Sequence, residues 1–148
     1  MPEEEAIERA REDRREGKSP STQAGEFVRE EMEHIREGEH GARSPEQAIA
    51  IGLSKARRAG VELPPPEKGD EETKRQAERD LAKGRAGGRK KSSRKRSRAT
   101  KGALKRESHR SASREALSRH AKRAAAKRSA RSRSAAAKKA ARTQKRRR

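Results

Sequence analysis

The clearest hydrophobic pattern in the chain lies between residues 19 and 63, where apolar side chains recur every three or four positions. The apolar positions of its first part fall on one face of a helix and are Ala24, Phe27, Val28, Met32 and Ile35. Ser19 or Thr22 can cap the N-terminus, Pro20 is tolerated in the first turn, and Gly38 is a natural end. The pattern therefore predicts an amphipathic helix that ends at Gly38.

A second amphipathic helix is predicted from Pro45 to about residue 59, with Gly60 at its end. Ser44 can act as the N-cap and Gln47 can reach back to it, as in a capping box. The apolar face includes small residues, which allow a neighbouring helix to approach closely, and consists of Ala48, Ile49, Ile51, Gly52, Leu53 and Ala56. A short loop joins the two helices, so the sequence predicts an αα-hairpin.

The hairpin is expected to bury a small core where its two apolar faces meet. The residues expected in this core are Phe27, Val28, Met32, Ile35, Ile49 and Leu53. Val61 and Leu63 can lie over the open end of the hairpin. We expect this unit to mediate self-association or the docking of a protein partner.

Charged segments flank the hairpin on both sides. Residues 3–16 are good helix formers with few apolar side chains, which predicts a solvated helix that frays. After the hairpin, Pro64-Pro65-Pro66 predicts an extended spacer, and residues 70–83 predict a transient solvated helix. The predicted parts are an acidic helix (1–18), the hairpin (19–63), a spacer with a charged helix (64–82) and a tail (83–148).

The tail has the composition of a low-complexity segment. Residues 83–148 contain 28 basic and two acidic side chains, 15 alanines and 10 serines, whereas residues 1–82 contain 15 basic and 21 acidic side chains. We therefore expect an intrinsically disordered basic tail, with coil over residues 84–102, in which residues 113–131 and 135–142 fold into helix on binding. Like charges four residues apart oppose this helix in water, at about 0.2 to 0.5 kcal/mol for each pair. They are Arg119, Arg123, Lys127 and Arg131.

Composition limits the size of any folded part. Leu, Ile, Val and Phe together number 12 of 148 residues, far below the fraction in ordinary domains. Burial of so little apolar surface cannot offset the conformational entropy of ordering the whole chain. The expected fold is mostly α, with a small two-helix hairpin, solvated helices and a long disordered tail.

The net charge of +20 favours polyanionic partners, with nucleic acid first among them. The chain has no cysteine, which excludes disulfides and thiolate metal sites. It has neither a secretory signal nor an apolar run long enough to span a membrane. We therefore expect a soluble, cytoplasmic, nucleoid-associated protein without a membrane partner.

Two glycine-containing segments resemble ligand-binding motifs but depart from them. Residues 84–92 have the outline of a phosphate-binding loop, yet Lys90 stands where glycine should precede Lys-Ser, and no strand is predicted before it. Residues 83–85 resemble the core of an AT-hook, but Ala86 replaces the proline that fixes its extended turn. We expect neither a nucleotide site nor a minor-groove preference here.

The histidines offer little evidence for a metal site. Glu30 and His34 share a helix face and His40 follows the helix, but a closed zinc site usually needs four ligands. These residues are expected to be exposed helix residues rather than ligands, and His109 and His120 lie among basic residues. No Ser, His and acid are placed on a scaffold rigid enough for nucleophilic catalysis. We expect no enzyme activity, no metal and no cofactor.

The basic tail is expected to contact phosphates without reading bases, because Phe27 is the only aromatic residue and base stacking needs aromatic side chains. DNA is the expected partner, and three alternatives are an RNA- or ribosome-associated protein, a protein-interaction module whose tail only localises it, and a solubilising polycation. The expected phosphate-binding residues are Arg94, Lys95, Arg96, Arg98, Lys105, Arg106, Arg119, Lys122, Arg123, Lys127, Arg128, Arg131, Arg133, Lys138, Lys139, Arg142, Lys145, Arg146, Arg147 and Arg148.

Two stretches resemble known proteins. The Lys/Ala-rich residues 121–128 and 135–142 resemble the tails of linker histones and of bacterial histone-H1-like proteins, which implies DNA binding by charge neutralisation. Residues 25–34 and 47–60, the latter with the motif QAIAIGLS-x-AR-x-AG, resemble a family of short bacterial proteins classed as a domain of unknown function. This second resemblance implies a bacterial source and assigns no functional residue.

Overall fold

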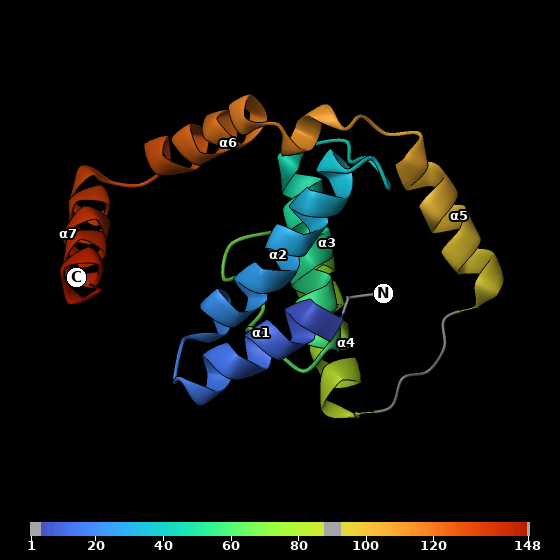
Figure 1. Ribbon diagram of the computed structural model, residues 1–148, viewed down its shortest axis with the longest axis horizontal. Helices are drawn as coiled ribbons and strands as arrows, with labels where there is room; N and C mark the ends of the chain where they lie inside the picture. The colour runs from blue at the N-terminus through green and yellow to red at the C-terminus, as the bar shows by residue number, and fades with distance from the viewer. Residues whose placement is uncertain (1–3, 88–92, 148) are drawn as a thin grey trace. The chain divides into compact units, whose positions relative to one another are not determined.

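The computed structural model describes residues 4–87 and 93–147, and over these residues the chain is mostly α-helical, as the sequence predicts (Figure 1). No strand occurs in the described parts. Contacts divide the chain into two units, residues 1–113 and residues 114–148. The helices are α1 (Glu4–Arg15), α2 (Pro20–Arg36), α3 (Pro45–Arg58), α4 (Glu71–Arg85), α5 (Arg94–Lys105), α6 (Arg114–Ala126) and α7 (Ala130–Arg146), with a short 3₁₀ helix η1 (Arg110–Ala112) before α6. None of the described helices is long and apolar enough to cross a membrane.

The two helices of the predicted hairpin, α2 and α3, pack against each other (Figure 1). Ser19 caps α2 by accepting a hydrogen bond from the backbone N–H of Thr22 at 3.4 Å. Ser44 caps α3 in the same way, accepting from the N–H of Gln47 at 3.2 Å. The Gln47 side chain reaches back one residue further than a capping box requires, to the N–H of Arg43. Both predicted helix starts are confirmed.

Small residues of α3 make most of its buried face. A Cβ added at Gly52 would lie 2.7 Å from the Cα of Val28, so the two helix backbones approach more closely there than any larger residue allows. The buried small residues recur every fourth position and are Ala48, Gly52 and Ala56. Close backbone approach is therefore what joins α2 to α3.

Because the helices approach so closely, three of the six predicted core residues are not fully buried. The predicted core residues that are buried are Phe27, Met32 and Ile35, and those that are only partly buried are Val28, Ile49 and Leu53. The reason is that the small residues of α3 occupy the contact with α2, which leaves the larger side chains of α3 at its edge. Val61 is buried and Leu63 packs against the core, as expected for the open end of the hairpin.

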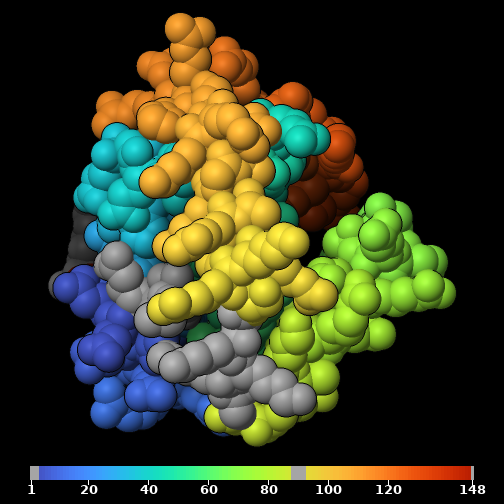
Figure 2. Space-filling view, turned by 90° about the vertical axis from the view of Figure 1, so that its right-hand side faces the viewer, coloured from blue at the N-terminus to red at the C-terminus, as the bar shows by residue number. Residues whose placement is uncertain are grey.

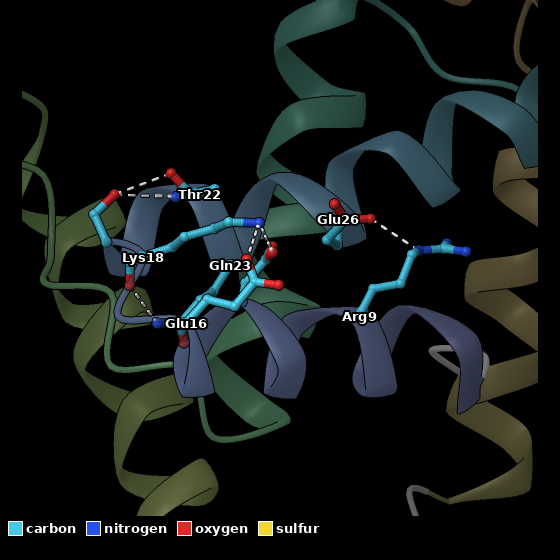
Figure 3. Close-up of polar contacts among 8 residues, drawn as sticks. Arg9, Glu16, Lys18, Thr22, Gln23 and Glu26 are labelled. Carbon is cyan, nitrogen blue, oxygen red and sulfur yellow. Dashed lines mark hydrogen bonds and ion pairs between the residues drawn. The ribbon is translucent and has the colours of Figure 1, made fainter. Parts of the chain in front are cut away.

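Helix α1 belongs to the folded unit and is not the fraying solvated helix that its charge predicts. Ala6 and Ala10 are buried in one cluster with Phe27, because alanine side chains let α1 lie close to α2. Arg9 of α1 points toward Glu26 of α2 and donates a 2.9 Å hydrogen bond to it (Figure 3). Between the helices, hydrogen bonds to two nearby acids raise the pKa of Lys18 above its ordinary value. These acids are Asp13 and Glu16.

Helix α4 also packs on the folded unit, so the proline spacer does not separate it from the hairpin. Its Asp80 is almost completely buried and accepts hydrogen bonds from two residues of α3, Ser54 at 2.7 Å and Arg58 at 2.8 Å. Ala77 and Leu81 are buried on the same face. The prediction of a transient helix was wrong because it counted only apolar anchors and missed this buried polar contact.

Most of the tail that the structure describes is helical, which differs from the expectation of a disordered segment. Helix α5 covers residues that were expected to be coil, and Gly102 lies within it. The predicted helix over 113–131 is divided in two, because Ser129 caps α7 by accepting a hydrogen bond from the N–H of Ser132. High alanine content accounts for α6 and α7, since alanine has the strongest intrinsic helix propensity, and the Ser129 cap adds to this in α7.

The start of the predicted tail docks onto the loop between α2 and α3. The N–H of Gly41 donates to the carbonyl of Leu104 at 2.8 Å, and the N–H of Ala42 donates to the carbonyl of Ser108 at 3.0 Å. Arg36 of α2 donates to the carbonyl of Ala112, which is buried. The first unit therefore extends through residue 113, 31 residues beyond the end at residue 82 that the charge pattern predicts.

Candidate nucleic-acid interface

The basic side chains that the sequence assigns to phosphate binding are exposed wherever the structure describes them. Six lie on or directly after α5, three on α6, and the rest on or around α7, while Arg148 lies outside the described residues. The two acidic residues in the same part of the sequence are Glu107 and Glu115. These side chains are therefore open to solvent in a region with little opposing charge.

Helix α7 arranges most of its positive charge along one face. At 100° per residue, four of its basic residues fall within about 60° of one another and span about 21 Å along the axis. These residues, the α7 stripe, are Arg131, Lys138, Arg142 and Lys145. Lys139 and Arg146 flank the stripe, and Arg133 points to the opposite side. The helix contains no acidic residue and buries none of its side chains.

Helix α5 carries a similar line of charge. Its spacing of four, three and four residues places four basic side chains within about 60°. These residues, the α5 stripe, are Arg94, Arg98, Lys101 and Lys105, and all are exposed. Figure 2 shows the side chains of α5, in yellow, projecting from the face that is turned to the viewer. Lys95 and Arg96 lie outside this line.

Sequence reasoning missed Lys101, because residues 84–102 were expected to form coil. Its spacing from Arg94 and Lys105 was the available signal, but it has meaning only once the segment is known to be helical. Arg119, Lys122 and Arg123 were correctly placed in a helix, α6.

The division between α6 and α7 interrupts the predicted ladder of like charges. Arg119 and Arg123 lie on α6, Lys127 falls after its end, and Arg131 begins a separate helix. Two of the three predicted repulsive pairs therefore do not face each other along one continuous helix. The repulsion within the remaining pair on α6 destabilises the helix by about 0.2 to 0.5 kcal/mol, which the helix propensity of the alanines can offset.

Both stripes consist of Lys and Arg, so the chemistry that they offer is contact with phosphate oxygens. Arg presents a planar fork of donors that matches phosphate, and Lys offers a compact point charge. A duplex carries one negative charge per about 1.7 Å of axis, so the 21 Å of the α7 stripe runs alongside roughly 12 phosphates. The interface contains no aromatic side chain for base stacking.

The structure also alters the interpretation of the histidines on α2. His34 is buried, not exposed as expected. The acidic residue beside it and His40 is Glu31 instead of Glu30. The signal for Glu31 was its i, i+3 spacing from His34, which places both on one helix face as the i, i+4 spacing of Glu30 also does.

The fold and the exposed charges define a small helical protein with a basic helical extension. Residues 15–68 match a family of unknown function (DUF6496), and this segment includes α2 and α3 but none of the basic helices. The resemblance of the hairpin to a domain of unknown function is thereby confirmed. No curated protein and no solved structure was found to be similar.

Proposed function

We propose that this protein binds DNA without sequence preference by neutralising phosphates, in the manner of a histone-H1-like, nucleoid-associated protein. The observation that carries the proposal is the α7 stripe, four basic residues on one face of a helix that has no acid and no buried side chain. A helix that buries none of its side chains has its whole length available for a polyanion. Catalysis, a cofactor and a membrane play no part in this function.

The α5 stripe gives the proposal a second point of contact. Because α5 belongs to the first unit and α7 to the second, the chain carries basic helices on both units. Two sites on one chain raise the effective concentration of each for the same DNA once the other is bound. The hairpin unit then serves to hold α5, or to recruit a protein partner or a second copy of the chain.

The helices of the second unit are proposed to depend on phosphate for their full stability. Isolated helices shorter than about 12 to 15 residues are marginal in water; α6, with 13 residues, lies in this range, and α7, with 17, is only slightly longer. We expect a peptide of residues 114–148 to be largely coil in low-salt buffer and to gain helix when duplex DNA is added. Circular dichroism measures the change, and a spectrum that stays unchanged at saturation contradicts coupled folding.

Removal of the second unit tests the proposed function directly. A chain of residues 1–113 lacks 15 of the 43 basic residues and one of the 23 acidic ones. In a mobility-shift titration we expect it to bind duplex DNA more than about tenfold more weakly than the full chain, because fewer counterions are released. Equal affinity of the two chains contradicts the proposal.

Competition with RNA distinguishes the proposed DNA partner from the main alternative. Ribosomal RNA is added to the complex of the full chain with duplex DNA, at matched phosphate concentration and matched salt. Duplex DNA is expected to be retained, because single-stranded segments release fewer counterions for each phosphate that is contacted. Displacement of the DNA by RNA at equal phosphate identifies an RNA-associated protein instead.

A further inference from the structure

Three potential metal ligands meet where α2 ends and the loop to α3 begins. Glu31 and His34 are one turn apart on α2, and Gly38, with φ +83°, turns the chain so that His40 returns to them. The ligand atoms of these three residues all lie within 4.8 Å of one another. Glu31 is fully buried and His34 is 8% exposed, so the cluster lies within the fold.

The Glu31 carboxylate is only half satisfied by the protein. Lys55 of α3 contacts its Oε1. Its Oε2 is buried and accepts no hydrogen bond from the residues that the structure describes. A buried carboxylate oxygen without a donor is costly, which calls for a positive group at this position. The Nε2 atom of His40 lies 3.2 Å from this oxygen.

The hydrogen bond of His40 determines what its Nε2 atom can offer. Nδ1 lies 3.0 Å from the carbonyl oxygen of Gly41, and a carbonyl can only accept, so Nδ1 carries the proton. In the neutral imidazole Nε2 is then a lone pair that faces the carboxylate oxygen of Glu31. Two electron-rich atoms at this distance repel each other unless a cation lies between them. An imidazole whose other nitrogen donates to a backbone carbonyl is also the usual arrangement of a metal-ligating histidine.

We propose that Glu31, His34 and His40 bind a divalent transition-metal ion, with Zn²⁺ as the best match to the ligand types. Zinc accepts imidazole nitrogen and carboxylate oxygen, and three protein ligands leave a fourth position for water or another donor. Glu39, whose Oε2 lies 3.8 Å from Nδ1 of His34, is close enough to supply that donor. Lys55 holds the second carboxylate oxygen and so fixes the orientation of Glu31, as outer partners of metal ligands do.

Local charge at the site favours a cation despite the positive net charge of the chain. The cluster lies near the C-terminal end of α2, which is the negative pole of the helix dipole. Acidic residues are also frequent in this part of the sequence, namely Glu30, Glu31, Glu33, Glu37 and Glu39. Most of the excess basic charge lies after residue 83.

A metal at this position would hold the loop onto which the basic extension docks. His40 precedes Gly41 and Ala42, whose N–H groups donate to the carbonyls of Leu104 and Ser108. Fixing His40 therefore fixes the two residues that pair with the end of α5 and the segment after it. We expect metal binding to raise the thermal stability of the first unit.

Metal titration of the untagged full-length chain tests the site. Zn²⁺ is titrated against a chromophoric chelator, and Co²⁺ is added separately to record its visible absorption. One ion is expected to bind per chain, and His34→Gln and His40→Gln are each expected to weaken binding by more than about tenfold. His120→Gln is the matched control, because it removes a histidine of the second unit and should leave affinity unchanged.

Two further readouts keep the test independent of folding in the variants. Circular dichroism without metal shows whether each variant retains its helices. X-ray absorption of the wild-type zinc protein is expected to show two imidazole ligands, whatever the variants do. Absence of saturable Zn²⁺ binding by the wild-type chain, or an equal loss of affinity in His120→Gln, overturns the proposal. The first of these outcomes would mean that Lys55 and His40 alone compensate the buried Glu31 carboxylate.

Discussion

Replacing the four residues of the α7 stripe with glutamine is expected to flatten the salt dependence of DNA affinity by about 3.6 in log-log slope. Each basic side chain that contacts a phosphate releases counterions and contributes about 0.9 to this slope. If ten charges contact phosphates in the full chain, the slope of log affinity against log salt is about −9, and the slope of the variant should be about −5. Because phosphates are contacted and bases are not, the loss should be the same for duplexes of different sequence.

A control variant with the same change in net charge separates local contact from the overall field. It replaces four exposed basic residues of the first unit with glutamine, namely Arg11, Arg15, Arg75 and Arg79. If the α7 stripe binds phosphate directly, this control retains the slope of the full chain within about one unit. If both variants flatten the slope equally, the stripe has no special role and net charge alone attracts the DNA.

The slope of the unmodified chain sets a stricter limit on the mechanism. Fluorescence anisotropy with labelled duplex gives the affinity at several salt concentrations between about 50 and 200 mM, the range over which phosphate contacts change affinity by orders of magnitude. A slope shallower than about −3 would mean that few phosphates are neutralised. The polycation mechanism would then be wrong, whichever residues are exposed.

The predictable parts of the fold were those with local signals. Serine caps, the glycine after α2 and the three-and-four spacing of apolar residues located both helices of the hairpin, because each acts within a few residues in sequence. The alanine-rich segments of the tail were also correctly predicted to form helix. The split between α6 and α7 depends on one side chain, Ser129, whose role as a cap only the structure reveals.

The parts that sequence reasoning missed depend on contacts between residues far apart in the chain. Helix α4 is held by Asp80, an acid that the apolar pattern ignores, through Ser54 and Arg58. Helix α1 is held by two alanines, which carry little weight in a count of large apolar residues. Charge and composition therefore underestimated how much of the chain can pack into one unit.

The cluster at the end of α2 illustrates the same limit for sites. Glu30 and Glu31 both have a spacing that brings a side chain near His34, and the sequence alone does not separate them. The choice is made by the turn at Gly38, which returns His40 to the side of α2 that Glu31 occupies. The spacing along α2 suggested a glutamate beside His34, and the turn at Gly38 determines that this glutamate is Glu31.

Gly52→Ala is expected to destabilise the first unit by about 1 to 3 kcal/mol, the usual cost of overpacking a well-packed contact. The added Cβ would lie 2.7 Å from the Cα of Val28, and a backbone atom cannot move aside as the end of a flexible side chain can. The helices α2 and α3 must therefore separate, which weakens the contact that joins them. Urea unfolding followed by circular dichroism gives the shift in midpoint.

Gly25→Ala makes the same chemical change in a helix where nothing lies within 4 Å of the added Cβ. This control is expected to stabilise the unit by about 0.5 to 1 kcal/mol, because alanine loses less conformational entropy in a helix than glycine does. The two variants should therefore shift the midpoint in opposite directions. DNA affinity should change less than about twofold in both, because neither glycine touches the basic helices and the sites are independent. If Gly52→Ala stabilises the protein as Gly25→Ala does, α2 and α3 do not meet at Gly52. The larger side chains at the edge of their contact would then hold the two helices together.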